Sequence, residues 1–286
     1  MEVAFKMQRL NPLNDYIFKR IMGEEESKDN LIAFLNAVLD ADDRKKLVDL
    51  EIVDNKELTK EMISDKSGRL DVRAKTADGM QLDIEVQLTN QHNVEKRTMF
   101  YWGKLFLEGI KKGDDYINLS KVITINILDF EFLDLDKFHS KYHLWEDAEE
   151  NYLLTDLIEI HFIETPKFKA LKEKDLKGNA LHRWLKFFDK MLSEEELKEL
   201  IEMDSAIKRA EKKLEYLSTD AETLALYKAR EDSLHERANM ISSAKKEKAL
   251  EIAKNLISME LDSDSITKAT GLTSEEIEVL RKASQN

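Results

Sequence analysis

The feature that most constrains the fold of this chain is a pair of alternating segments, residues 69–74 and 82–88, on either side of a short turn sequence. Apolar and polar residues alternate strictly in both, which is the period-two pattern of a half-buried β-strand. One face of the resulting hairpin would be apolar. The other would be a polar face rich in acidic and amide side chains, which are poor strand formers. The polar face consists of Arg69, Asp71, Arg73, Asp83, Glu85 and Gln87.

The length of the turn decides which residues face each other. Residues directly opposite in an antiparallel pair share a face, so placing Asp71 beside Glu85 requires a loop with an odd number of residues. The three-residue loop Ala77-Asp78-Gly79 meets this condition, with Gly79 in the left-handed position of a type I turn plus bulge. Paired carboxylates repel unless a cation lies between them, and Mg²⁺ commonly takes one or two carboxylates. A solvated polar face is the alternative interpretation.

The segments around the hairpin predict an α/β core with a mixed sheet. Helical periodicity in residues 11–39, broken at Gly23, comes first, and an alternating strand at 47–54 precedes the hairpin. A helix is expected at 93–112. The apolar run 122–128 is typical of a strand covered on both faces. The order is therefore αβββαβ.

The remainder of the chain predicts one more strand and then only helices. The additional strand is expected at 156–163, just before Pro166. We therefore place a domain boundary there, giving domains 1–165 and 166–286. The whole chain has only eight glycines and two prolines, which leaves little room for linkers and favours long helices.

Composition excludes several classes of protein. The 286 residues include no cysteine, which excludes disulfides and thiol nucleophiles and fits a reducing cytoplasm. No run of about 18 apolar residues is present, so we expect no membrane-spanning helix and no membrane partner. A net charge of −13 argues against a general nucleic-acid coat but leaves room for a local basic groove.

Three further groups of residues have two interpretations each. Arg97, Tyr101, Lys104 and Glu108 recur at helical spacing and form a polar stripe that faces either solvent or the hairpin. Asp15 caps the first helix or contributes to the site, and we favour the cap. The pair His139 and His143 has metal-ligand spacing in an expected helix next to Trp145, and we favour surface or core histidines over metal ligands.

The chain resembles the PD-(D/E)XK nuclease superfamily, and more nearly its recombination-promoting nuclease/putative transposase family. The resemblance implies a restriction-endonuclease-like αβββαβ core followed by an all-helical C-terminal region, with metal-dependent endonucleolytic cleavage of DNA linked to recombination. It is carried by Asp15, Phe18, Lys19, Arg69, Asp71, Val72, Gly79, Glu85, Val86, Gln87, Arg97, Tyr101 and the terminal segment 270–277.

The same resemblance implies roles for individual residues. Asp71 and Glu85 become ligands of Mg²⁺ or another divalent cation, with the Val86 carbonyl as a third, and Gln87 completes the catalytic set. The superfamily has a lysine where Gln87 stands, although glutamine is usual in the nearer family. An amide cannot supply a positive charge. The candidate sources of that charge are Arg69, Arg73, Arg97 and Lys104, and the candidate DNA contacts are these residues together with Tyr101.

The C-terminal segment 264–280 has the spacing of a helix-turn-helix, joined at Gly271. A DNA-reading helix would begin with Arg, Lys or Asn, but Ser274, Glu275 and Glu276 stand there. We therefore expect a protein-interaction or regulatory role, and the C-terminal helices are a candidate surface for homo-oligomerisation. A catalytically silent DNA-binding or assembly module is the alternative to an endonuclease.

Overall fold

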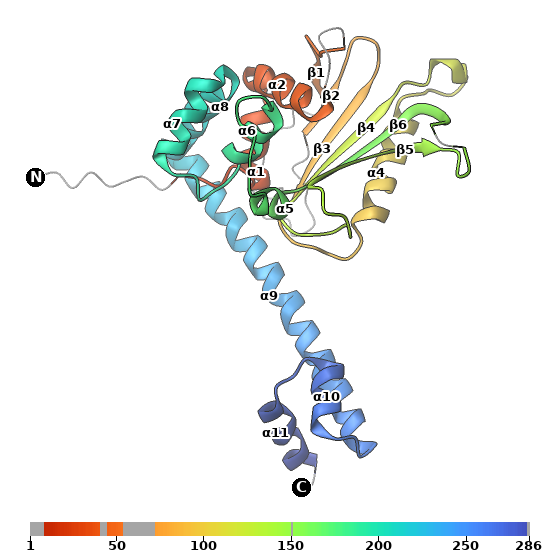
Figure 1. Ribbon diagram of the computed structural model, residues 1–286, viewed down its shortest axis with the longest axis vertical. Coiled ribbons are helices and arrows are strands. Elements are labelled where there is room, and N and C mark those ends of the chain that lie inside the picture. Colours follow the sequence, from red (N-terminus) through yellow and green to blue (C-terminus); the bar gives the residue numbers. More distant parts are fainter. Residues whose placement is uncertain (1–8, 41–44, 54–71, 150, 285–286) are drawn as a thin grey trace, which may run out of the picture. The chain divides into compact units, whose positions relative to one another are not determined.

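A computed structural model describes residues 9–40, 45–53, 72–149 and 151–284 (Figure 1). The chain forms two compact units, Met1–Arg230 and Glu231–Asn286, which are described in turn. In the described part of the chain, no helix is both long and apolar enough to cross a membrane.

The first unit is built on a six-stranded mixed sheet in the order β1-β2-β3-β4-β6-β5 (Figure 1). The three central strands β3, β4 and β6 are parallel, and β1, β2 and β5 each pair antiparallel with a neighbour. The mixed sheet and the αβββαβ order are therefore confirmed. The strands are β1 Glu51–Val53, β2 Val72–Lys75, β3 Gln81–Gln87, β4 Val122–Leu128, β5 His139–Trp145 and β6 Leu153–Glu164.

The turn between β2 and β3 has the predicted length and conformation. Thr76 N donates to Met80 O and Gly79 N donates to Thr76 O, both at 3.0 Å, which encloses the loop 77–79. Gly79 has a φ of 91°, in the left-handed region that glycine favours. Beyond the turn, Val72 pairs with Ile84. The odd-length loop and its parity are confirmed over the described part of the hairpin.

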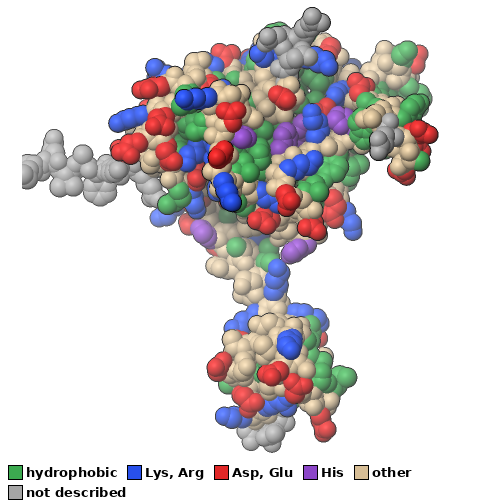
Figure 2. Space-filling model, viewed as in Figure 1, with side chains coloured by type: hydrophobic (Ala, Val, Ile, Leu, Met, Phe, Trp, Pro, Cys, Tyr) green, Lys and Arg blue, Asp and Glu red, His purple; other side chains and the backbone are tan. Residues whose placement is uncertain are grey.

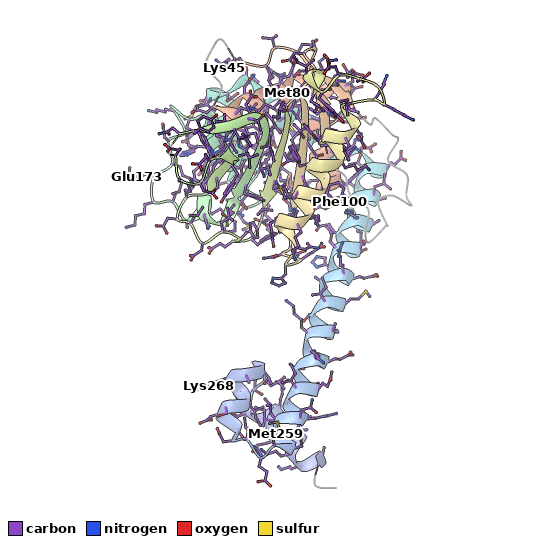
Figure 3. The ribbon with its side chains drawn as sticks, turned by 90° about the vertical axis from the view of Figure 1, so that its right-hand side faces the viewer. Lys45, Met80, Phe100, Glu173, Met259 and Lys268 are labelled. Carbon is purple, nitrogen blue, oxygen red and sulfur yellow. The ribbon has the colours of Figure 1, made fainter. Side chains whose placement is uncertain are left out.

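The apolar face of the hairpin lies in the main hydrophobic core. Val72, Ala74, Leu82 and Ile84 are buried there against α1 Asp15–Met22 and α2 Lys28–Leu39. The 3₁₀ helix Glu25–Ser27 joins these two helices. The mostly apolar β4 is buried along its whole length, because the core covers one face and α4 Val94–Glu108 covers the other. Figure 3 shows α4 lying across the sheet.

The helices that follow Pro166 share this core with the sheet. Buried side chains of α6 and α8, including Trp184 and Leu214, belong to the same cluster as those of α1, α2 and the hairpin. The division into compact units falls at Arg230 and does not coincide with the boundary expected at residue 165. The helices are α5 Thr165–Ala170, α6 Ala180–Phe187, α7 Glu194–Met203 and α8 Ser205–Thr219.

The first helix is capped by Asn14, so the cap assigned to Asp15 is wrong by one residue. The Asn14 side chain accepts from the backbone N–H groups of Tyr16 and Ile17. Asp15 instead accepts a bidentate contact from Arg230, with Nε to Oδ1 at 2.9 Å and Nη2 to Oδ2 at 2.5 Å. Arg230 lies on α9 Ala221–Ser258, so this ion pair fixes the first part of α9 to the first unit.

Residues 139–145 form a strand, β5, and the helix expected around His139 and His143 is wrong. The strand is at the edge of the sheet and alternates between faces, with Ser140 buried and its neighbours more exposed. The tip of the β5–β6 hairpin includes Asn151, whose φ of 68° is left-handed. An edge strand is half exposed, so its polar face shows little of the apolar pattern by which a strand is recognised.

The second unit contains the end of α9, α10 Ser263–Thr270 and α11 Ser274–Ser284. Its small core is formed by Ala253, Ile266, Leu272 and Ile277. Gly271 ends α10 with a φ of 73°. Thr273 and Glu276 form a reciprocal cap of α11, because the backbone N–H of each donates to the side chain of the other, at 3.0 and 3.2 Å.

Candidate active site

The polar face of β3 is buried beneath α4. The side chains of Asp83, Glu85 and Gln87 point from this strand toward the helix, and these residues are only 4, 7 and 5% exposed. Across the parallel pair, Asp83 lies opposite Thr124 and Glu85 opposite Asn126. A solvated polar face is therefore excluded for this part of the hairpin. Buried carboxylates require a positive or hydrogen-bonding partner.

Hydrogen bonds from buried and half-buried side chains fix α4 over the sheet. Thr98 Oγ1 lies 2.9 Å from Asn126 Oδ1 on β4, and the Gln81 amide of β3 donates to the Leu105 carbonyl of the helix at 2.9 Å. The Trp102 indole donates to the backbone carbonyl at the start of β4 at 3.2 Å. These contacts set the rotation of α4 and determine which residue of its polar stripe reaches β3.

Arg97 is the residue of the stripe that reaches Glu85. Its guanidinium forms an ion pair and hydrogen bond with Glu85 Oε1, and both side chains are largely buried. The other carboxylate oxygen, Oε2, accepts from Gln87 Nε2 at 3.4 Å. Glu85, Gln87 and Arg97, three of the residues singled out in the sequence, therefore form one cluster at the end of β3.

Two other candidate cations, Arg73 and Lys104, lie farther along the same face. Arg73 of β2 lies 3.6 Å from Asp83 Oδ1 and 3.8 Å from Glu108 Oε2. Lys104 is half exposed and lies 3.9 Å from the same Glu108 carboxylate. Tyr101 packs its ring edge-on against Phe100, with the ring centroids 5.2 Å apart. Among the candidate cations that the structure describes, Arg97 is thus the one that contacts Glu85.

Two predicted site residues, Arg69 and Asp71, lie outside the described residues. The register is described up to the pair Val72 and Ile84. The pairing of Asp71 with Glu85 and the roles of Arg69 and Asp71 therefore stay predictions.

The described residues contain no group of three or more His, Cys, Asp or Glu side chains arranged to hold a metal ion. The oxygen donors of the cluster are nevertheless of the kind that Mg²⁺ prefers. Gln87 Oε1 is buried and has no hydrogen-bond partner within the described structure, and the amide lies beside the Glu85 carboxylate. An orphaned buried oxygen next to a carboxylate fits a divalent cation in donor type, with Asp71 as the predicted further donor. The ligand role of the Val86 carbonyl stays a prediction.

A second polar cluster lies on the opposite face of the sheet, on β5 and β6. His139 Nε2 is 2.8 Å from His161 Nδ1, and His161 Nε2 is 2.7 Å from Glu159 Oε1. The second oxygen of Glu159 contacts His143 at 3.3 Å and Lys121 at 2.5 Å. Figure 2 shows histidine side chains gathered near the middle of the visible face of the first unit.

Burial and neighbouring charges shift the pKa values in this cluster. Burial, with a smaller contribution from His161, lowers the pKa of His139 to about 4. Burial also lowers the pKa of His161, against the opposing effect of Glu159. Burial alone would raise the pKa of Glu159, but hydrogen bonds from His161 and Lys121 hold it well below its usual range. The ionised Glu159 carboxylate can only accept, so His161 donates from Nε2 and accepts at Nδ1 from His139.

The sequence pointed to His139 and His143 as a pair but missed their partners. The signal was present in Ile158-Glu-Ile-His-Phe162, where Glu159 and His161 alternate with apolar residues along a strand. Period-two spacing places both on one face, but only the pairing of β5 with β6 brings His139 against His161.

A carboxylate-bearing central strand, paired with an antiparallel hairpin partner and covered by a helix carrying an arginine, defines a nuclease-like α/β protein. Residues 12–244 match the family described as PD-(D/E)XK nuclease family transposase, and the chain belongs to this family. Residues 246–282 match the C-terminal HTH domain of the Rpn/YhgA-like nuclease family. The comparisons with curated proteins and with solved structures gave no match.

Proposed function

We propose that the chain is a metal-dependent DNA endonuclease that hydrolyses phosphodiester bonds in recombination or transposase-like reactions. The observation that carries the proposal is the buried cluster of Glu85, Gln87 and Arg97 on the central strand of a chain that belongs to a nuclease family. DNA is the substrate class, and its phosphates are the groups that the cluster would recognise.

In this proposal Asp71 and Glu85 hold the cation, with the Val86 carbonyl as a third donor. Bound Mg²⁺ would neutralise the scissile phosphate and lower the pKa of a water. Gln87 would orient a water through Oε1, a buried acceptor without a partner among the described residues, or a phosphate oxygen through the Nε2 donor. Arg97 supplies the positive charge that a lysine would have provided at position 87.

The helix-turn-helix match supports DNA as the partner class. The first turn of α11 nevertheless carries Glu275 and Glu276, and Glu276 is held by its cap and by Lys246 at 2.8 Å. Acidic residues at this position disfavour contact with phosphate. We therefore assign α11 a protein-contact or regulatory role, and oligomerisation through the C-terminal helices remains a separate proposal.

Plasmid nicking in the presence of Mg²⁺ tests the proposed activity. We expect the full chain to nick supercoiled DNA and EDTA to stop the reaction. Asp71→Asn and Glu85→Gln should abolish nicking because each removes a ligand charge. Glu95→Gln, an exposed carboxylate on α4, is the matched control and should cleave at the wild-type rate. Undiminished nicking by the Asp71 or Glu85 variant would remove that residue from the mechanism.

A catalytically silent DNA-binding or assembly module is the second candidate, and one observation favours it. Arg97 already neutralises Glu85, so this carboxylate is electrically satisfied by the chain itself. This alternative predicts DNA binding that EDTA does not change and no nicking with Mg²⁺ or Mn²⁺. The same plasmid assay, with a gel-shift measurement alongside, separates the two functions.

A further inference from the structure

The Glu85 carboxylate has positive or hydrogen-bonding contacts at both of its oxygens. Arg97 donates to Oε1 and Gln87 Nε2 donates to Oε2 at 3.4 Å. The side chains of Glu85 and Arg97 are 9 and 13% exposed, so their attraction is only weakly screened by water. Any cation that binds Glu85 must compete with this guanidinium.

The competition follows from distance. A Mg²⁺ ion binds a carboxylate oxygen at about 2 Å, and a guanidinium nitrogen hydrogen-bonds to it at about 2.8 Å. Both charges at the same carboxylate would lie within about 5 Å of each other in a largely water-free site, where repulsion is strong. Glu85 therefore accommodates one of the two positive partners at full strength.

We propose that Arg97 is a counter-ion latch, which neutralises Glu85 in the resting site and transfers to a DNA phosphate when the cation binds. The inference rests on the proposed function and assigns regulation to the same site. Arginine suits this exchange because its long side chain has several rotatable bonds and its planar donors match both a carboxylate and a phosphate. Glu85 exchanges one cation for another, and Arg97 exchanges one anion for another.

The exchange makes cation and DNA binding cooperative. A phosphate that draws Arg97 away from Glu85 raises the affinity of Glu85 for the cation. By linkage, the cation then raises the affinity for DNA by the same factor. The resting site thus disfavours a loaded cation in the absence of substrate.

Arg73 provides a matched comparison on the same sheet face. Its side chain is 19% exposed, close to the value for Arg97, but its recorded ion pairs are with Asp83 and Glu108. Replacing either arginine by glutamine removes one positive charge, from α4 in the case of Arg97 and from β2 in the case of Arg73. Only the replacement of Arg97 removes the charge that contacts Glu85.

Isothermal titration of the full chain with Ca²⁺, in the absence of DNA, measures the competition directly. We expect Arg97→Gln to tighten Ca²⁺ binding by about tenfold or more, since one nearby positive charge is removed. Arg73→Gln should change the affinity by much less, and Glu85→Gln should lose binding. Arg97→Lys keeps the charge and should stay close to the wild type. Circular dichroism of each variant checks that it is folded.

The direction in which Arg97→Gln changes the Ca²⁺ affinity decides whether Arg97 competes with the cation or only holds Glu85 in position. If Arg97 merely held Glu85 in place, Arg97→Gln would weaken Ca²⁺ binding or leave it unchanged, and either result overturns the latch. Wild-type binding would then still stand in support of the proposed metal site. If neither the wild type nor Arg97→Gln binds Ca²⁺ or Mg²⁺, the metal-dependent function is overturned and the latch with it.

A second titration tests the transfer to phosphate. Ca²⁺ binding is measured with and without a short DNA duplex, for the wild type and for Arg97→Gln. DNA should tighten Ca²⁺ binding several-fold more in the wild type, because only there does it draw a competing charge away from Glu85. An equal effect of DNA on both proteins would refute the transfer.

Discussion

The pH dependence of the free energy of unfolding should report on the hydrogen-bonded side chains of His139, His161 and Glu159. His139 has a pKa of about 4 in the folded protein because of burial, against about 6.5 in an unfolded chain. Between these values the unfolded state binds the proton and the folded state does not. Stability therefore falls as the pH is lowered from 7 toward 4, and the contribution of His139 no longer changes below that.

The size of the effect follows from the two pKa values. For His139 alone, lowering the pH from 7 to 5 should decrease the free energy of unfolding by about 2 kcal/mol. The lowered pKa of His161 acts in the same direction over the same range. Glu159 acts in a different window, because its lowered pKa removes stability only below the pKa of an unfolded glutamate, about 4.5.

Urea unfolding followed by tryptophan fluorescence is a suitable assay, because all three tryptophans lie in the first unit and Trp184 is in its core. His139→Gln retains a donor for His161 but does not titrate, so its unfolding free energy should decrease less between pH 7 and pH 5 than that of the wild type. The exposed His92→Gln is the control and should follow the wild type. Parallel curves for His139→Gln and the wild type would refute the buried, neutral state of His139.

Two further substitutions test the fold. Arg230→Ala leaves Asp15 without its bidentate partner and should lower the free energy of unfolding of the first unit by about 3 kcal/mol. The control is Lys228→Ala, at an exposed position of the same helix, which should change this free energy by less than about 0.5 kcal/mol. Equal effects of the two substitutions would contradict the ion pair. Gly79→Ala adds a Cβ to a residue with a φ of 91° and places it 2.5 Å from Ser120 Oγ. Denaturant unfolding should therefore show a decrease in the free energy of unfolding of about 1 kcal/mol or more. An unchanged free energy of unfolding would contradict the turn.

The sequence was most informative where one physical requirement determined the structure. The run 122–128 is apolar at nearly every position, and β4 has these bounds. The alternation around Gly79 gave both the turn length and the parity of β2 and β3, because a one-residue error would have buried the charged side chains in the main core.

Other features depended on contacts between distant segments and were not accessible from local pattern. The strand at His139–Trp145 is an edge strand, and among the described strands its pairing partner is β6. Asp15 pairs with Arg230, which lies 215 residues farther along the chain, so no local pattern could identify this partner. The helical stripe of α4 identified Arg97, but the rotation of the helix, fixed by Thr98 on Asn126, decided that it reaches Glu85.

The buried charges beneath α4 are difficult to explain as a device for stability. Removing an ion pair from water costs more than its attraction returns in many proteins, and well-packed apolar residues are often more stable in the same place. The opposite face of the same hairpin shows that this chain can build such packing from Val72, Ile84 and their neighbours. The charged residues on the face beneath α4 therefore contribute less to stability than well-packed apolar residues would in the same positions. A site in which Glu85 exchanges one positive partner for another gives that loss a function.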